Sequence, residues 1–153
     1  MFFIGDGPAV SENKKYVVNN HLEKFVIFAG AIERMYVADY IAGLDIAIQP
    51  RVTDYASPMK IIEYMVMGKA IIAPDKQNIN DILKNGENAL LFKSEDMSDL
   101  YDKLELIIKD KDFREKLSRN ALNTVTEKNL YWLENAKKSI NILTIYDLVE
   151  YNE

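Results

Sequence analysis

Short apolar runs alternate with amphipathic helical segments from Phe2 to Phe92, and this alternation restricts the chain to few folds. Glycine and proline residues lie near the ends of these segments, as expected of turns. Short strands separated by helices indicate βαβ units, whose strands lie parallel in one sheet. Right-handed crossovers then place helices on both faces. We therefore predict an α/β fold with a doubly wound parallel sheet of about five strands. The expected strands are residues 2–4, 25–29, 44–48, 70–73 and 89–92, and the expected helices are 8–20, 33–42, 58–67 and 77–83.

From Ser94 onward the pattern is helical. Ser94 or Asp96 is available as an N-cap, and apolar residues then recur at helical spacing in three stripes. The simplest interpretation of each stripe is core packing, so C-terminal helices should follow the sheet. The stripes begin at Met97, Phe113 and Trp132.

Composition narrows the class of protein. The 153 residues are 48% hydrophobic and 28% charged, which is typical of a single globular domain. A net charge of -5 argues against nucleic acid as the main partner. Cysteine is absent, which excludes disulfides and thiolate metal sites. Neither a membrane-spanning run nor a secretion signal is recognisable, so we expect a cytoplasmic location.

The helix expected after Ser57 is the best candidate for a ligand site. Ser57 suits the N-cap and Pro58 the first turn, where the missing N–H costs nothing. Glu63 interrupts the otherwise apolar helix and could accept two hydrogen bonds from a vicinal diol such as ribose. Equally, it could be a half-exposed residue paired with Lys60 or Lys69. Lys60 could contact a phosphate oxygen or be a solvated charge.

Two turns after strands are further candidates. Gly5 and Gly7 follow the first strand and precede a helix, where backbone N–H groups favour a phosphate. A tight βα turn without a ligand is the commoner explanation of such a pair. Ala31 and Ile32 follow the second strand with the same ambiguity. Because ligands bind beyond the carboxyl ends of parallel strands, these turns and the loop from Pro50 should share one rim.

Residues suited to catalysis are not evident. His21 is the only histidine, and it lies in a polar connection without a recognisable partner. The sequence contains no Gly-x-Ser-x-Gly elbow, no Walker loop and no His/Asp/Glu cluster at metal-ligand spacing. We therefore assign no catalytic residue and no metal site.

Taken together, the segments resemble the C-terminal, donor-binding domain of a retaining GT-B glycosyltransferase of family 4 (glycosyl transferases group 1), a Rossmann-like fold. Five motifs occur in the family's order, and their combination is far more specific than any one alone. They are Phe3-Ile4-Gly5-Asp6-Gly7-Pro8, Val26 to Gly30, Tyr40 to Pro50, Ser57-Pro58-Met59-Lys60 with Glu63-Tyr64-Met65, and Asn85 to Leu91.

The resemblance implies that the chain binds the nucleotide diphosphate part of a nucleotide-sugar, which is a donor substrate rather than a cofactor. Glu63 aligns with the second glutamate of the family's Glu-x7-Glu motif, which binds the donor ribose. Residues 57–60, including Met59, correspond to the helix start whose amides meet the diphosphate. Ala31 and Ile32 fall where the family places the nucleobase, and the turn from Gly5 to Gly7 lines the same cleft.

The sequence also departs from the family pattern. Tyr55 occupies the position of the first glutamate, although the adjacent Asp54 could substitute for it. We expect the strand that would precede Met1 to be missing, together with the cations that neutralise the leaving diphosphate. We also expect the N-terminal acceptor domain to be missing. We therefore expect residues 1–153 to hold a donor without transferring sugar alone. In the full-length enzyme the acceptor would be a sugar or lipid-linked saccharide, with peripheral membrane association a further possibility.

Two alternatives stay open. One is another GT-B nucleotide-sugar enzyme such as an epimerase, which would need acid/base residues in the donor cleft. The other is a truncated, inactive module for binding or dimerisation. Exposed apolar surface beside the missing strand would favour this second alternative, which predicts a homodimer.

Overall fold

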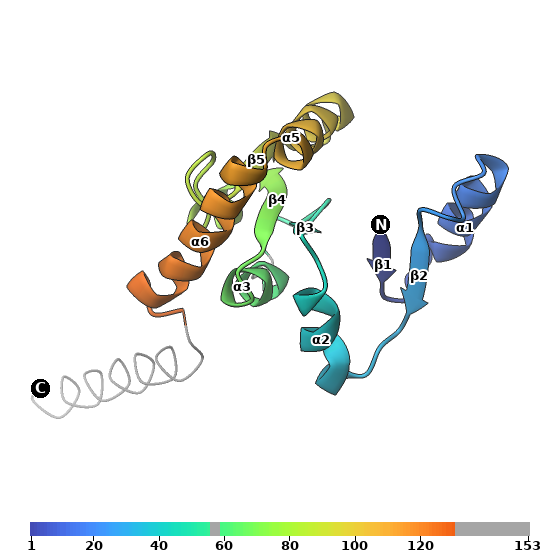
Figure 1. The fold of residues 1–153 in the computed structure, drawn as a ribbon, viewed down its shortest axis with the longest axis horizontal. Helices are drawn as coiled ribbons and strands as arrows, with labels where there is room; N and C mark the ends of the chain where they lie inside the picture. The colour runs from blue at the N-terminus through green and yellow to red at the C-terminus, as the bar shows by residue number, and fades with distance from the viewer. Residues whose placement is uncertain (56–58, 131–153) are drawn as a thin grey trace, which may run out of the picture. The chain divides into compact units, whose positions relative to one another are not determined.

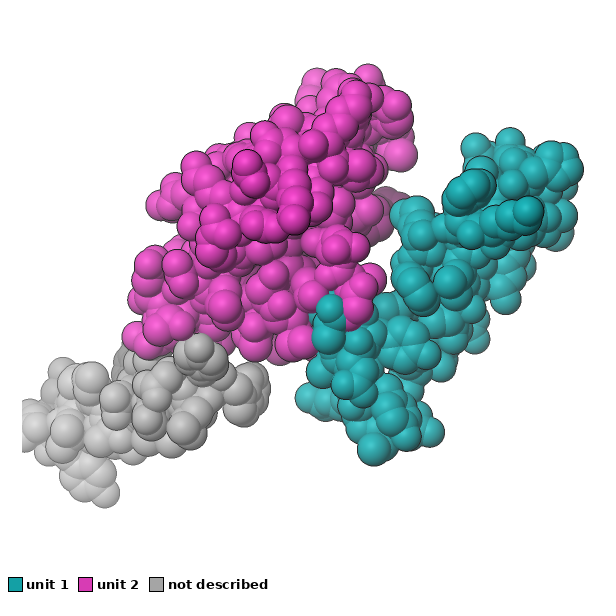
Figure 2. Space-filling view, in the orientation of Figure 1, with its two compact units in different colours: residues 1–42 teal, residues 43–153 magenta. Residues whose placement is uncertain are grey.

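A computed structural model describes residues 1–55 and 59–130 and divides the chain into two compact units, residues 1–42 and residues 43–153 (Figure 2). The elements follow the predicted alternation of strands and helices (Figure 1). All strand pairings found in the described residues are parallel. The α/β class is thus confirmed. Where one sheet of about five strands was predicted, the strands form a two-stranded sheet in unit 1 and a three-stranded sheet in unit 2, because no hydrogen-bonded pairing among the described residues joins the second strand to the third. The third predicted stripe, from Trp132, lies outside the described residues.

Unit 1 consists of a two-stranded sheet and short helices. Strands β1 (Phe2–Ile4) and β2 (Ile27–Gly30) pair in parallel, and α1 (Val10–Asn19) lies between them in the sequence. The Phe3 and Phe28 rings stack 5.0 Å apart, with the Lys14 ammonium of α1 over Phe28. The helix expected over 33–42 divides into a 3-10 turn, Arg34–Tyr36, and α2, Val37–Ala42.

Unit 2 contains a three-stranded parallel sheet in the order β3-β4-β5. The central strand β4 (Ala70–Asp75) is buried from Ala70 to Pro74, as its continuous apolar run requires. It extends two residues past the predicted end at Ala73, because β5 pairs along it as far as Asp75. Its neighbours are β3 (Ile46–Ile48) and β5 (Leu90–Lys93).

Helices cover both faces of this sheet, as a doubly wound arrangement demands. One core cluster joins Ile71 and Ala73 of β4 to α3 (Met59–Val66) and α4 (Gln77–Asn80). The other joins Ala70 and Ile72 to α5 (Met97–Lys109). The last described helix, α6 (Lys111–Glu127), contributes to both clusters (Figure 1). The alternating side chains of one strand thus separate two apolar cores.

Capping residues set the ends of the two long helices. The Asp96 carboxylate accepts hydrogen bonds from the N–H groups of Ser98 and Asp99, which confirms one of the two predicted caps. The Asp110 carboxylate accepts from the Phe113 N–H and begins α6. Arg114 then donates to the carbonyls of Ile107 and Ile108 at the end of α5. These contacts fix the corner between α5 and α6.

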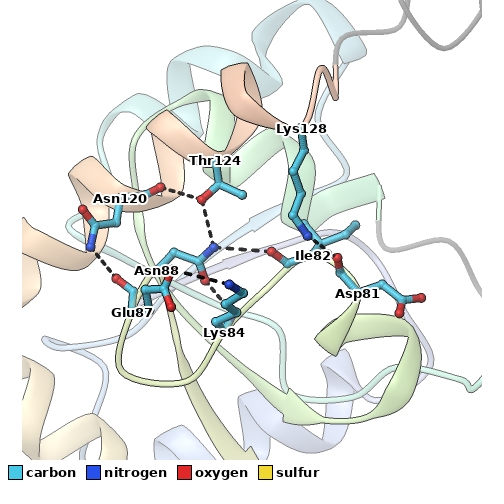
Figure 3. Close-up of polar contacts among 8 residues, drawn as sticks. All are labelled: Asp81, Ile82, Lys84, Glu87, Asn88, Asn120, Thr124 and Lys128. Atoms are coloured by element: carbon cyan, nitrogen blue, oxygen red, sulfur yellow. Dashed lines mark hydrogen bonds and ion pairs between the residues drawn. The ribbon is translucent and has the colours of Figure 1, made fainter.

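The turn before β5 is held by a buried asparagine, Asn88, which is 3% exposed (Figure 3). Its Oδ1 accepts from the Lys84 N–H at 2.7 Å. Its Nδ2 donates to the Thr124 hydroxyl at 3.0 Å and to the Ile82 carbonyl at 3.3 Å. The side chain therefore joins the α4–β5 connection to α6.

Candidate functional site

The structure gathers the predicted site residues into two groups, one in each unit. Gly5, Gly7, Ala31 and Ile32 belong to unit 1. Met59, Lys60 and Glu63 lie on α3 of unit 2. Ser57 and Pro58 lie outside the described residues.

In unit 1, the two predicted turns lie at the same edge of the sheet. Because β1 and β2 are parallel, their carboxyl ends coincide, and the Gly5 N–H donates to the Gly30 carbonyl at 2.8 Å. Gly5 has φ +123 and Gly30 has φ +72, which other residues adopt only with strain. Gly5, Gly7 and Ala31 are exposed and Ile32 is half-buried. Backbone groups at this edge are therefore open to a ligand.

In unit 2, α3 presents polar side chains on a helix that is anchored by its opposite face. Ile61 and Met65 are fully buried against β4 and α6. Glu63 and Lys60 are exposed, and Met59 is 52% exposed. Burial of one face therefore fixes which side chains the other face offers to solvent.

The Glu63 carboxylate has no ion pair among residues 1–55 and 59–130. An ion pair with Lys60, one of the two pairings that would explain Glu63 as an ordinary surface residue, is not found there. Its neighbour Tyr64 is half-buried, and burial, with a smaller effect from the Glu63 charge, raises the pKa of the Tyr64 phenol. Glu63 is thus a solvated carboxylate on a fixed helix.

The loop before α3 makes two contacts that sequence reasoning missed. The Lys76 ammonium lies 2.8 Å from Oδ1 of Asp54, and the Asn78 amide donates to the Thr53 carbonyl at 3.1 Å. Lys76 follows the last residue of β4, and this position next to a carboxyl strand end is the signal that could have identified it. Tyr55, which occupies the position of the family's first glutamate, is 91% exposed.

Other surface features lie apart from these residues. Two hollows in unit 2 contain none of the predicted site residues. One, of about 700 Å³, is lined by α5 and the start of α6, and the other, of about 380 Å³, is lined mainly by α6. No cluster of His, Asp or Glu in the described ranges is arranged to hold a metal ion. Among the helices that the structure describes, none is long and apolar enough to cross a membrane.

Comparison with known proteins gives the family. Residues 1–124 match the family described as Glycosyl transferases group 1. The chain belongs to this family. Among curated proteins it is 22% identical over 117 residues to the alpha-D-kanosaminyltransferase of Streptomyces kanamyceticus, covering 76% of this chain and 30% of that protein. It is also 22% identical over 138 residues to an uncharacterized glycosyltransferase of Methanocaldococcus jannaschii, covering 90% of this chain and 35% of the relative. This group 1 chain thus spans about a third of the length of these relatives.

Solved structures agree on the fold. The C-terminal domain of a glycosyl transferase group 1 family protein (LpcC) from Francisella tularensis superposes with a TM-score of 0.71 at 25% identity, over 80% of this chain and 65% of that one. Sucrose-phosphate synthase from Thermosynechococcus elongatus gives 0.80 at 19% identity, over 99% and 39%. Anabaena Alr3699/HepE, solved in complex with UDP, gives 0.73 at 20% identity, over 82% and 35%. The group 1 chain therefore has the fold of a GT-B C-terminal domain.

Proposed function

We propose that this group 1 domain binds the nucleotide diphosphate part of a nucleotide-sugar, for retaining transfer of the sugar to an acceptor. The observation that carries the proposal is Glu63, an exposed carboxylate without an ion pair among the described residues, on a helix whose other face is fully buried. A solvated, fixed carboxylate can accept both hydroxyl hydrogens of a ribose diol. The structure of Alr3699/HepE in complex with UDP supports a nucleotide ligand.

The remaining site residues have supporting roles in this proposal. Lys60, one turn before Glu63 on α3, would add positive charge near the diphosphate. By the sequence resemblance, Ser57, Pro58 and Met59 correspond to the helix start whose amides would bind phosphate oxygens. The glycine turn after β1 and the Ala31–Ile32 turn after β2 would line the cleft and the base site. Retaining stereochemistry, membership of family 4 and a saccharide or lipid-linked acceptor rest on the sequence resemblance. The proposed cytoplasmic location rests on the sequence, in which no membrane-spanning run and no secretion signal is recognisable.

Calorimetric titration with UDP, GDP and ADP tests the proposal. We expect one nucleotide to bind selectively and Glu63→Ala to weaken it about tenfold or more, because two hydrogen bonds to a charged acceptor are lost. Glu63→Gln should lie in between, since one amide oxygen remains as acceptor. Glu127→Ala, which removes an exposed carboxylate from α6, is the control and should bind normally. Failure of the unaltered chain to bind any of the three nucleotides would refute the donor-site proposal.

A second candidate function, a dimerisation module, is favoured by unit 1. Phe2 and Ile4 of β1 lie on the same face of the sheet as Ile27 of β2. The exposed fractions of Phe2, Ile4 and Ile27 are 49%, 37% and 51%. Only Val17 and Ile41 among the apolar residues of this unit are buried. Such a contiguous apolar face is typical of an interaction surface.

Sedimentation velocity tests the dimer. We expect the chain to dimerise with increasing concentration and Ile27→Lys to keep it monomeric, because the ammonium would be desolvated in the interface. Leu122→Lys, at an exposed apolar residue of unit 2, should not change the profile. A strictly monomeric profile of the unaltered chain at high concentration would contradict this candidate.

A further inference from the structure

The loop of residues 51–55 is held to the β4–α4 turn by two side chains from a distant part of the sequence. Lys76 forms an ion pair with Asp54, 22 residues earlier, and Asn78 binds the Thr53 carbonyl, 25 residues earlier. Both anchors come from the residues that directly follow β4. The loop itself leads along the chain toward α3, which carries Glu63.

The backbone of Lys76 is fixed. It follows a strand that is buried from Ala70 to Pro74, and it has extended dihedrals of φ -141 and ψ 151. Its carbonyl accepts hydrogen bonds from the N–H groups of Ile79 and Asn80, both at 2.9 Å. The Lys76 side chain, 24% exposed, therefore starts from a point set by the sheet and by α4.

The loop has little burial of its own to hold it. The side chain of Asp54 is 86% exposed, and Tyr55 beside it is 91% exposed. Val52 is half-buried against the core cluster that includes Ile61 and Met65. Apart from the packing of Val52, the ion pair and the Asn78 hydrogen bond are the contacts found among residues 1–55 and 59–130 that restrain Thr53 and Asp54.

We infer that Lys76 is a positioning residue of the donor site, which acts through its ion pair with Asp54 to hold the loop of residues 51–55 that precedes α3 in the sequence. This inference rests on the proposed function of α3. In this arrangement Asp54 is an anchor of the loop and does not serve as a replacement for the carboxylate absent at Tyr55. Asn78 provides a second anchor one residue earlier, at Thr53. A carboxylate already engaged at 2.8 Å by an ammonium would have to break that contact before it could hold a sugar hydroxyl.

The test compares the two partners of the ion pair by titration with UDP, GDP and ADP. We expect Asp54→Asn and Lys76→Met each to weaken binding of the selected nucleotide about two- to fivefold, the range of an exposed ion pair. The double variant should bind no more weakly than either single variant, because both substitutions remove the same contact. The reversed pair, Asp54→Lys with Lys76→Asp, should recover most of the affinity. Lys109→Met, which breaks a 2.7 Å ion pair with Glu105 on α5, is the matched control and should bind normally.

The outcomes separate the inference from the proposed function. Loss of affinity in Lys76→Met but not in Asp54→Asn would mean that Lys76 contacts the ligand directly, and would overturn the positioning role. Unchanged affinity in both variants would also overturn it while leaving the donor site in place. Additive losses in the double variant would show that the two residues act independently. If the unaltered chain binds none of the three nucleotides, the donor-site proposal fails and the inference fails with it. A thermal unfolding curve for each variant distinguishes loss of binding from loss of folding.

Discussion

Removal of the Asn88 side chain should measurably destabilise unit 2. It is 3% exposed and forms hydrogen bonds with Lys84, Ile82 and Thr124 (Figure 3). Asn88→Ala removes all of these hydrogen bonds, so the Lys84 N–H, the Ile82 carbonyl and the Thr124 hydroxyl each lose this partner. At about 1 kcal/mol for each bond, and more where a partner stays unsatisfied, the free energy of unfolding should fall by about 2–4 kcal/mol.

Urea denaturation followed by far-ultraviolet circular dichroism measures this loss. Hydrogen exchange of the β4 and β5 amides reports on unit 2 specifically. The control is Asn120→Ala on α6, which removes one hydrogen bond, to the Glu87 carbonyl, from a half-buried side chain. Its cost should be about 1 kcal/mol or less.

A double-mutant cycle refines the comparison. Thr124→Val keeps the side-chain shape and removes the hydroxyl that accepts from Asn88. The double variant should lose about 1 kcal/mol less free energy of unfolding than the sum of the losses in Asn88→Ala and Thr124→Val, because the two residues share a hydrogen bond. The reasoning is refuted if Asn88→Ala costs no more than Asn120→Ala, or if the two members of the cycle are fully additive.

Two further effects should be measurable in unit 2. Ile61→Ala should lower the free energy of unfolding by about 2–5 kcal/mol in a urea titration, because removal of the fully buried side chain leaves a cavity between α3 and β4. A loss under about 1 kcal/mol would contradict the packing described. The hydrogen bond from the Lys93 N–H is the main cause that lowers the pKa of Asp99, with Lys103 contributing. The ionised Asp99 carboxylate therefore stabilises the fold fully above its ordinary pKa of 3.8, and this stabilisation disappears as the pH falls through the lower pKa of the folded state. Asp99→Asn should make the unfolding midpoint depend less on pH in this acid range. An unchanged pH dependence would contradict the assignment.

The sequence determined the order and type of the elements. Short apolar runs and period-3.6 patterns, with glycine and proline between them, are local properties that identify strands and helices without knowledge of their partners. The apolar run from Ala70 predicted a strand that is buried on both faces, and β4 is such a strand. The boundaries were less accurate, because pairing with β5 rather than local preference carries β4 to Asp75.

The candidate site was predicted from a motif, and its role stays a prediction. Helical spacing and resemblance pointed to the segment from Ser57 to Lys60 and to Glu63, and the structure places Met59, Lys60 and Glu63 on α3. The structure adds that Glu63 is exposed while Ile61 and Met65 on the same helix are buried.

The tertiary structure alone decided which distant residues meet. Its position after β4 marks Lys76 as a candidate site residue, but the sequence does not show that Lys76 meets Asp54. Nor does it show that Asn88 meets Thr124, which lies 36 residues further along the chain. These pairs exist because parallel strands bring their carboxyl ends to one edge and because α6 packs beside the connection before β5. Secondary structure follows from the periodicity of a single segment, whereas polar contacts between segments require the packed sheet to bring their residues within hydrogen-bond distance.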